Sequence, residues 1–459
     1  MKGEAQPLRR TITPRDGLAQ RFERVERLAS ILLITAAAIL VSAASMASDE
    51  ESWLTRKHGS GDWDGLRQKW LEDGVVPSGF YVFDILGNPT GGIDQDMAYA
   101  GLAEFDLSLN LNRLAGARGL AFDVAFSWSS GSNLSDDIGN VFQVGEAYSG
   151  QTVQLTRLFF EQTLGGGTLF LKLGRVSAGN DFAILPANIY FVNAAINGNP
   201  LSIALNEPGF FTDPVAQWGL RMLYQPNDRL RFRLAAYNPD PTVGEEGKHG
   251  FDFSFNPANG VLVMAEVGYR PEIKAGGKKY RGIYKAGAYV DTSNFASIDD
   301  SSLHHSSQYG LYFMAQQEVS HEDRDPHEIE YHPLLGRHLI RTEAPINVTT
   351  TRQGLTPWLV LALSPREEIS TMPVYVAGGL LYHGLFKGRP NDRTGIGVFY
   401  GRFSDHLPER GSETVIELNH MFQPTPYFYL APDLQFVINP GGTEIPDALV
   451  LGFETGFTF

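Results

Sequence analysis

The sequence predicts an all-β protein, a transmembrane antiparallel β-barrel of about 16 strands with a short N-terminal periplasmic helix. Strand-like segments fill the intervals between regularly spaced glycines and prolines. The last eleven residues alternate between an apolar face ending in Phe459 and a small or polar face. Beyond residue 47 there is no apolar run of about 18 residues, the length of a membrane helix. Since every backbone polar group in lipid needs a partner, such a chain has to close its strands into a barrel to span a membrane.

The start of the chain predicts export. Residues 1–27 carry seven Lys or Arg and four Asp or Glu, an apolar run follows at 28–41, and small residues end at Ala47. This pattern is typical of a secretory signal peptide, here residues 1–47. A single transmembrane anchor is the alternative, and the shortness of the apolar run argues against it. The chain contains no cysteine, so disulfides and thiol chemistry are both excluded.

Residues 48–78 are predicted to form a periplasmic segment with a short helix. Leu66, Trp70 and Leu71 fall on one helical face, and Gly74 ends the segment. We expect this helix to plug or to support the periplasmic mouth of a barrel formed by residues 79–459.

Residues 101–112 show the clearest strand pattern, because Phe105 and Leu107 alternate with Glu104 and Asp106. A strand of a soluble β-sandwich is the alternative for any one segment, but it rarely alternates for ten residues. The sixteen predicted strands are 79–86, 101–112, 119–129, 151–164, 167–176, 216–226, 229–238, 260–270, 281–291, 306–318, 353–364, 371–383, 393–403, 412–423, 427–438 and 447–459.

Connection lengths support this assignment. Both chain ends of a bacterial barrel face the periplasm, so every second connection is a short turn and the others are longer outer loops. The second, fourth and sixth connections, 113–118, 165–166 and 227–228, are short, while the third and fifth, 130–150 and 177–215, are long. The polar insertion at 319–352 breaks the rule, because it falls on the expected periplasmic side.

Several motifs in order along the chain resemble the OprB-type carbohydrate-selective porins. They are the Gly-Asp-Trp-Asp-Gly-Leu-Arg stretch at 61–67 with 73–74, and residues 86–92, 157–162, 284–289, 388–392 and 431–442. The resemblance covers residues 59–459. It implies a sixteen-stranded barrel in the bacterial outer membrane that admits sugars by diffusion, as a monomer or homotrimer. The insertion at 319–352 and Asp64, where the family has glycine, depart from the pattern. The C-terminal Phe459 looks like the signal read by the barrel-assembly machinery.

The long 177–215 connection is predicted to fold inward and narrow the lumen, and an external lid is the alternative. Strand alternation predicts which charges face the lumen, since Arg or Lys at the lipid midplane costs about 2–4 kcal/mol. Glu266 and Gln435 also face inward by this argument. Such charges can bind sugar hydroxyls through charge-assisted hydrogen bonds, or they can be ordinary wall charges that pair with one another. The predicted pore-lining or constriction residues are Arg157, Glu161, Lys172, Asn188, Asn193, Arg221, Arg231, Arg233, Lys285 and Asp433.

Other functions receive little support. The net charge of −15, or −18 without the +3 of residues 1–47, disfavours nucleic acid. The crowded charges at 321–328 indicate a solvated loop rather than a metal site. His304 and His305 with Ser306 and Ser307 lack an acidic partner for hydrolysis. Outer-loop pairs such as 136–137 and 299–300 are expected near lipopolysaccharide and outer-membrane lipid.

The sequence therefore predicts a sugar-preferring diffusion porin, without catalysis, cofactor or metal. The substrates are expected to be mono- or small oligosaccharides. A general diffusion porin of the same fold is the main alternative. A barrel enzyme and a barrel that exports or binds polysaccharide are weaker ones.

Overall fold

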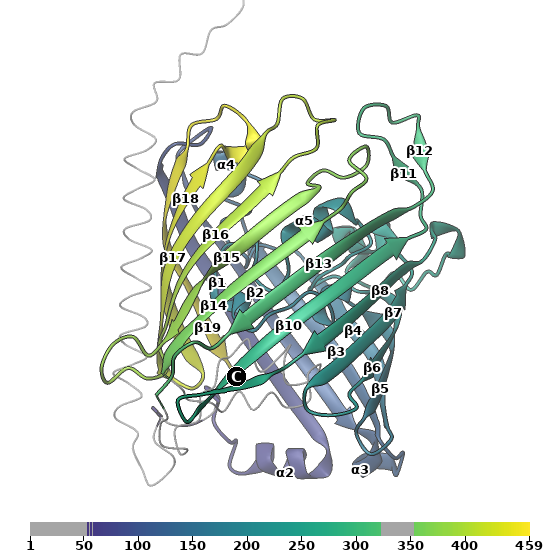
Figure 1. The fold of residues 1–459 in the computed structure, drawn as a ribbon. Coiled ribbons are helices and arrows are strands. Elements are labelled where there is room, and N and C mark those ends of the chain that lie inside the picture. The colour runs from purple at the N-terminus through teal and green to yellow at the C-terminus, as the bar shows by residue number, and fades with distance from the viewer. Residues whose placement is uncertain (1–52, 55, 57, 323–352) are drawn as a thin grey trace, which may run out of the picture. The chain divides into compact units, whose positions relative to one another are not determined.

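The computed structural model describes residues 53, 54, 56, 58–322 and 353–459. The predicted signal peptide and residues 323–352 of the insertion lie outside this part of the chain. Within it, sixteen antiparallel strands form a closed barrel, because β1 pairs with β2 on one side and with β19 on the other. Figure 1 shows the strands inclined to the barrel axis and the outer loops gathered at one end. No helix of the described residues is long and apolar enough to cross a membrane.

All sixteen predicted strands are present, and each pairs with its neighbours in chain order. The first strand is longer than predicted, since it runs from Val75 rather than from residue 79. The barrel strands are β1 (Val75–Thr90), β2 (Met97–Asn110), β3 (Leu120–Gly131), β4 (Val153–Leu164), β5 (Leu169–Val176), β6 (Gln217–Tyr224), β7 (Leu230–Tyr237), β8 (Leu262–Tyr269), β10 (Lys278–Asp291), β13 (Gln308–Gln317), β14 (Gly354–Leu363), β15 (Val374–His383), β16 (Arg393–Arg402), β17 (Ser412–Thr425), β18 (Phe428–Ile438) and β19 (Ala448–Thr458).

Three short strands lie outside this ring. β9 (Glu272–Ala275) makes a hairpin with the first residues of β10. β11 (Phe295–Ala296) and β12 (His304–His305) pair with each other in the loop before β13. They extend loops and do not alter the order of the barrel strands.

The barrel is apolar outside and polar inside, the reverse of a soluble core. In β2 the side chain of Phe105 is 59% exposed, whereas its neighbour Glu104 is 1% exposed. In β17, Leu418 is exposed and Glu417 is fully buried. This alternation is what a strand needs when one face contacts lipid and the other lines a lumen.

The predicted N-terminal helix is present as α2 (Leu66–Asp73), and Gly74 ends it with a left-handed backbone (φ 94°). Arg113 donates hydrogen bonds to the carbonyl oxygens of Leu71 and Glu72, at 2.9 and 2.8 Å, and so ties α2 to the short helix that follows β2. None of its side chains is buried. Figure 1 places α2 beside α3 (Leu111–Ala115), at the end of the barrel opposite the outer loops.

The remaining helices are short and belong to connections. They are α4 (Ser135–Ile138), α5 (Leu201–Asn206) and the 3-10 turns η1 (Ala178–Asn180), η2 (Asn188–Tyr190), η3 (Pro241–Gly244), η4 (Glu246–Lys248), η5 (Pro257–Asn259) and η6 (Pro440–Gly442).

Candidate functional site

The 177–215 connection between β5 and β6 folds into the barrel and packs against its inner wall. Phe191 is buried, and its ring lies 5.1 Å from that of Trp358 and 5.8 Å from that of Phe399, which belong to β14 and β16. Tyr375 of β15 donates a hydrogen bond to the carbonyl oxygen of Ala195 at 2.7 Å. The loop therefore reaches the wall opposite its own strands, a position that an external lid does not have.

Carboxylates of the wall accept hydrogen bonds from the backbone of this loop. Glu417 accepts from the backbone N–H groups of Val192 and Asn193 at 2.8 and 3.1 Å. On the other side of the barrel, Glu266 accepts from the backbone N–H of Ala183 at 3.0 Å. A loop buried away from water has to satisfy its backbone donors, and these two inward carboxylates fix its path across the lumen.

A second loop, residues 132–152 between β3 and β4, also folds inward. Glu413 of β17 accepts from the backbone N–H groups of Val141 and Phe142, at 2.9 and 2.6 Å. The backbone N–H of Ala194 donates to the carbonyl oxygen of Gln143 at 2.9 Å and joins the two loops. The sequence predicted one constricting loop, and the structure adds this second one.

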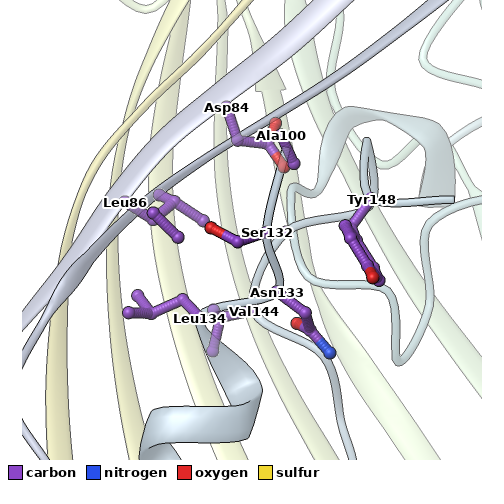
Figure 2. Close-up of a pocket in the computed structure, with 10 residues that line it drawn as sticks. Asp84, Leu86, Ala100, Ser132, Asn133, Leu134, Val144 and Tyr148 are labelled. Carbon is purple, nitrogen blue, oxygen red and sulfur yellow. The ribbon is translucent and has the colours of Figure 1, made fainter. Parts of the chain in front are cut away.

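A water-sized pocket marks the place where the second loop meets the wall. Figure 2 shows Asp84 and Leu86 of β1 on one side of it, and Asn133, Val144 and Tyr148 of the loop on the other. Its size leaves room for about one water molecule.

Arg157 of β4 forms the centre of one charge cluster. Its guanidinium lies 2.9 Å from the carboxylate of Glu104, 2.7 Å from Asp106, 3.6 Å from Asp123 and 2.8 Å from Asp213. The first three acids belong to β2 and β3, and Asp213 belongs to the 177–215 loop. Arg157 thus joins the wall to the end of the loop, and 11% of its side chain is still exposed.

Lys172 and Arg221 form a second cluster with the start of the same loop. Lys172 Nζ lies 3.0 Å from Asp181, and Arg221 Nε lies 3.1 Å from the same carboxylate. Arg221 also bonds Glu161 of β4 at 2.9 Å. Burial alone would raise the pKa of Asp181, but the charges of Arg221 and Lys172 outweigh it and hold the pKa below its usual value.

A third cluster surrounds Glu266 of β8. Its carboxylate bonds Arg233 at 2.7 Å, lies 3.5 Å from Lys285 Nζ, and accepts from the hydroxyl of Tyr312 at 2.9 Å. All four side chains are buried. Glu266 also accepts a hydrogen bond from Ala183 of the loop. The ion pairs of Glu266 with Arg233 and Lys285 therefore stiffen one of the two main attachments of the loop.

The opposite wall, β17 to β19 with β1, carries mainly acids and amides. Asp84 of β1 lies opposite Glu454 of β19 in the strand register, and Tyr429 donates to Glu454 at 2.6 Å. Gln435 donates to Asp433 at 2.6 Å. The basic wall, β4 to β10, thus faces an acidic wall across the lumen.

The structure places every predicted pore residue within the barrel. Arg157 and Glu161, with exposed side-chain fractions of 11% and 20%, keep some access to solvent. The remaining eight are buried, and most of them bond other wall or loop groups. Arg231 donates to the backbone oxygens of Asn227 and Leu230. Asn193 donates to Gln435 at 2.8 Å. The buried Asn188 amide makes no hydrogen bond within the described residues.

The sequence analysis missed five acids that organise the site. Glu104, Asp106 and Asp123 surround Arg157, and Glu413 and Glu417 hold the two loops. A signal was present for the first three, because Glu104 and Asp106 alternate with Phe105, and Asp123 alternates with its apolar neighbours, so all three had to face inward. Nothing local marks Glu413 or Glu417 as a partner of a loop more than two hundred residues away.

Among the described residues, no group of three or more His, Cys, Asp or Glu side chains is arranged to hold a metal ion.

A closed sixteen-stranded barrel with a loop folded into its lumen defines a porin-type channel. The chain belongs to the OprB family of carbohydrate-selective porins, whose model matches residues 94–459. Porins of this kind are channels rather than enzymes, and the family and fold together imply a protein of the bacterial outer membrane.

Individual relatives agree with this assignment. Porin B of Pseudomonas aeruginosa is 26% identical over 463 residues, which cover 91% of this chain and 93% of that protein. The putative porin QuiX of Acinetobacter baylyi is 23% identical, over 93% of this chain and 98% of its own. The high-pH structure of Pseudomonas putida OprB has a TM-score of 0.76 at 26% identity, and covers 88% of this chain and 99% of its own.

Proposed function

We propose that this protein lets mono- and small oligosaccharides cross the outer membrane by passive diffusion through a polar, charged constriction. The observation that carries the proposal is the 177–215 loop, which spans the lumen between Glu266 and Glu417. A loop held at both walls gives a narrowing of fixed shape. Family membership supports sugars as the solutes.

Within this constriction we assign sugar contact to Arg157 and Glu161. They are the two charged residues of the predicted set that keep solvent access. A guanidinium offers several donors and a carboxylate accepts, so together they replace the water around a sugar hydroxyl. Binding of this kind has to be weak enough for release on the far side. The fully buried charges position the loop and set the shape of the passage.

The remaining assignments complete the proposal. Residues 1–47 serve as a signal peptide, and 48–78 as a periplasmic segment with a short helix, although β1 already starts at Val75. The barrel inserts through the barrel-assembly machinery and contacts lipid and lipopolysaccharide. It works as a monomer or homotrimer, without cofactor, metal, nucleic acid or catalysis.

Single-channel conductance in a planar bilayer tests the proposal. Glucose and maltose are titrated against an uncharged solute of similar size that is not a sugar. We expect saturable block of the current by the sugars and none by the control. Equal effects of all three solutes would instead show a general diffusion porin, and the absence of any channel would overturn both assignments.

A further inference from the structure

Arg175 occupies an unusual position, because the alternation of β5 places it on the lipid-facing side of the barrel. Lys172 faces inward, and Leu173 faces outward with 58% of its side chain exposed. Two residues further on, Arg175 shares the face of Leu173, yet it is only 1% exposed. A bare arginine on this face would be unfavourable in lipid, so the structure has to cover it.

Residues 249–256, in the loop between β7 and β8, cover Arg175 from outside, and we call them the outer strap. The Arg175 guanidinium donates to the backbone oxygen of Asp252 in the strap and, at 2.5 Å, to that of Ala216. It also lies 5.5 Å from the centre of the Phe253 ring. The positive charge is therefore enclosed by carbonyl oxygens and an aromatic face.

The outer strap makes hydrogen bonds with β4 and β6, on either side of β5. The backbone N–H of Leu155, in β4, donates to the carbonyl oxygen of His249 at 2.9 Å. The indole N–H of Trp218, in β6, donates to the carbonyl oxygen of Phe253 at 3.1 Å. Arg175 of β5 lies between these two attachments. The strap is thus attached to β4, β5 and β6 through the backbone oxygens of His249, Asp252 and Phe253.

Two of the three strands that the strap contacts, β5 and β6, are short, and so are the next two, β7 and β8, whereas β4 has 12 residues. β5, β6, β7 and β8 contain 8 residues each, against 16 in β1 and 14 in β2. A tilted strand needs about 9–11 residues to cross the hydrocarbon layer. β5 ends early because the chain turns into the lumen at Ser177, and β6 begins only when it returns. The barrel wall alone is therefore too short in this sector.

Three aromatic side chains of the strap extend the apolar exterior there. Phe251, Phe253 and Phe255 are 57%, 43% and 63% exposed. The Phe251 ring lies 6.4 Å from that of Phe126, an outward-facing residue of β3, so the patch is continuous with the lipid-facing band. The carboxylate of Asp252, between two of these phenylalanines, is paired with Lys248 at 2.8 Å.

We propose that the outer strap lies against the acyl chains of the outer leaflet, where its phenylalanines complete the lipid-facing surface over the shortened strands. Lipid is the occupant because the patch continues the exterior band of the barrel and covers a charge that lipid cannot accept. The inward turn of the constriction loop thus shortens β5 and β6, and the strap covers the exterior over these short strands.

The absence of cysteine allows a direct test with single-cysteine variants of the full chain in liposomes. Phe255→Cys reports on the strap, Leu220→Cys on the lipid-facing side of β6, and Ser301→Cys on an exposed outer loop. Each carries an environment-sensitive fluorophore, which is quenched either by nitroxide-labelled lipids or by iodide in the water. Unchanged sugar conductance shows that each labelled barrel is folded.

We expect the Phe255 label to follow the Leu220 label, with quenching by the lipid nitroxides and at least several-fold protection from iodide relative to the Ser301 label. Quenching by iodide to the same extent as at Ser301 would place the strap in water and overturn the proposal. Protection from both quenchers would also overturn it, because a second copy of the protein would then cover the patch.

Discussion

The two walls of the lumen hold the constriction in different ways. On the basic wall, Arg157, Lys172 and Arg221 form ion pairs with carboxylates of the loop. On the acidic wall, Glu417 and Glu413 accept hydrogen bonds from neutral backbone N–H groups. The basic wall therefore fixes the ends of the 177–215 loop mainly by ion pairs, beside the one backbone hydrogen bond from Ala183 to Glu266. The acidic wall fixes the middle of that loop and part of the second one through hydrogen bonds.

From the comparison of the two walls we expect the largest change in stability and ion selectivity when Arg157 is replaced. Arg157→Gln leaves Glu104, Asp106, Asp123 and Asp213 around a neutral side chain, and breaking a buried ion pair typically costs about 3–5 kcal/mol. We expect lower thermal stability, followed by the heat-dependent gel shift of the barrel, together with weaker sugar block. The channel should also become more cation-selective, which the reversal potential in a salt gradient measures.

Arg157→Lys is the matched control, because it keeps the charge and loses only the forked donor geometry. It should retain the selectivity of the wild type while losing part of the sugar block. Wild-type stability and selectivity in Arg157→Gln would show that the basic wall is not held by this ion pair.

A smaller effect is expected at Glu417 on the acidic wall. Glu417→Ala leaves the backbone N–H groups of Val192 and Asn193 without their acceptor, and each buried unsatisfied group costs about 1–3 kcal/mol. We expect a destabilised loop, visible as extra conductance noise and a higher mean conductance. Glu417→Gln keeps one acceptor oxygen, so its conductance noise and mean conductance should lie between those of Glu417→Ala and the wild type. A quiet, unchanged current in Glu417→Ala would contradict the assigned role.

The ion pairs of Asp181 with Lys172 and Arg221 predict that the stability of the loop depends on pH. Its pKa in the folded protein is depressed, so its contribution to stability is present above the ordinary aspartate pKa of about 3.9 and is lost as the pH falls through the folded value. In the wild type we expect the thermal stability to fall, and the conductance noise from the loop to rise, as the pH drops below the ordinary aspartate pKa of about 3.9. Asp181→Asn should have lower stability at neutral pH and lack this part of the acid dependence. An identical acid profile for the two proteins would count against the ion pairs with Lys172 and Arg221.

The smallest effect is expected at Asn188, whose buried amide lacks a hydrogen-bond partner within the described residues. Asn188→Leu has a similar volume and removes the unsatisfied groups, so we expect stability to stay the same or rise by about 1 kcal/mol. Sugar block should be unchanged, because the side chain is not exposed. Loss of block in a stable Asn188→Leu barrel would show instead that sugar reaches this position.

Much of the fold was predictable because strand alternation is a local property. Phe105 beside Glu104 predicts the orientation of β2 without knowledge of any other strand. The ends were less predictable. Pro77, Gly79 and Gly87 suggest that the first strand is short, yet it extends from Val75 to Thr90 because β2 pairs with its first residues, Val75 opposite Leu109. A neighbouring strand can hold residues that are poor strand formers by themselves.

The candidate site was predictable in its residues and not in its partners. Alternation placed Arg157, Lys172 and Arg221 inside, and the length of the 177–215 connection predicted that it folds inward. The link from Asn193 to Gln435 joins positions 242 residues apart in the chain, and no local pattern indicates it. The second inward loop was missed for the same reason.

Arg175 illustrates the difference between what the sequence determines and what only the tertiary structure decides. The sequence by itself determined that β5 carries a charge on its lipid-facing side, because period-two alternation is a property of the extended backbone. Only the tertiary structure decided how that charge is tolerated, since the segment that covers it is about eighty residues further along the chain. In the same way the sequence determined the sixteen strands and the inward direction of the pore charges. The pairing of those charges with the loops, and so the shape of the constriction, depends on contacts that exist only once the barrel closes.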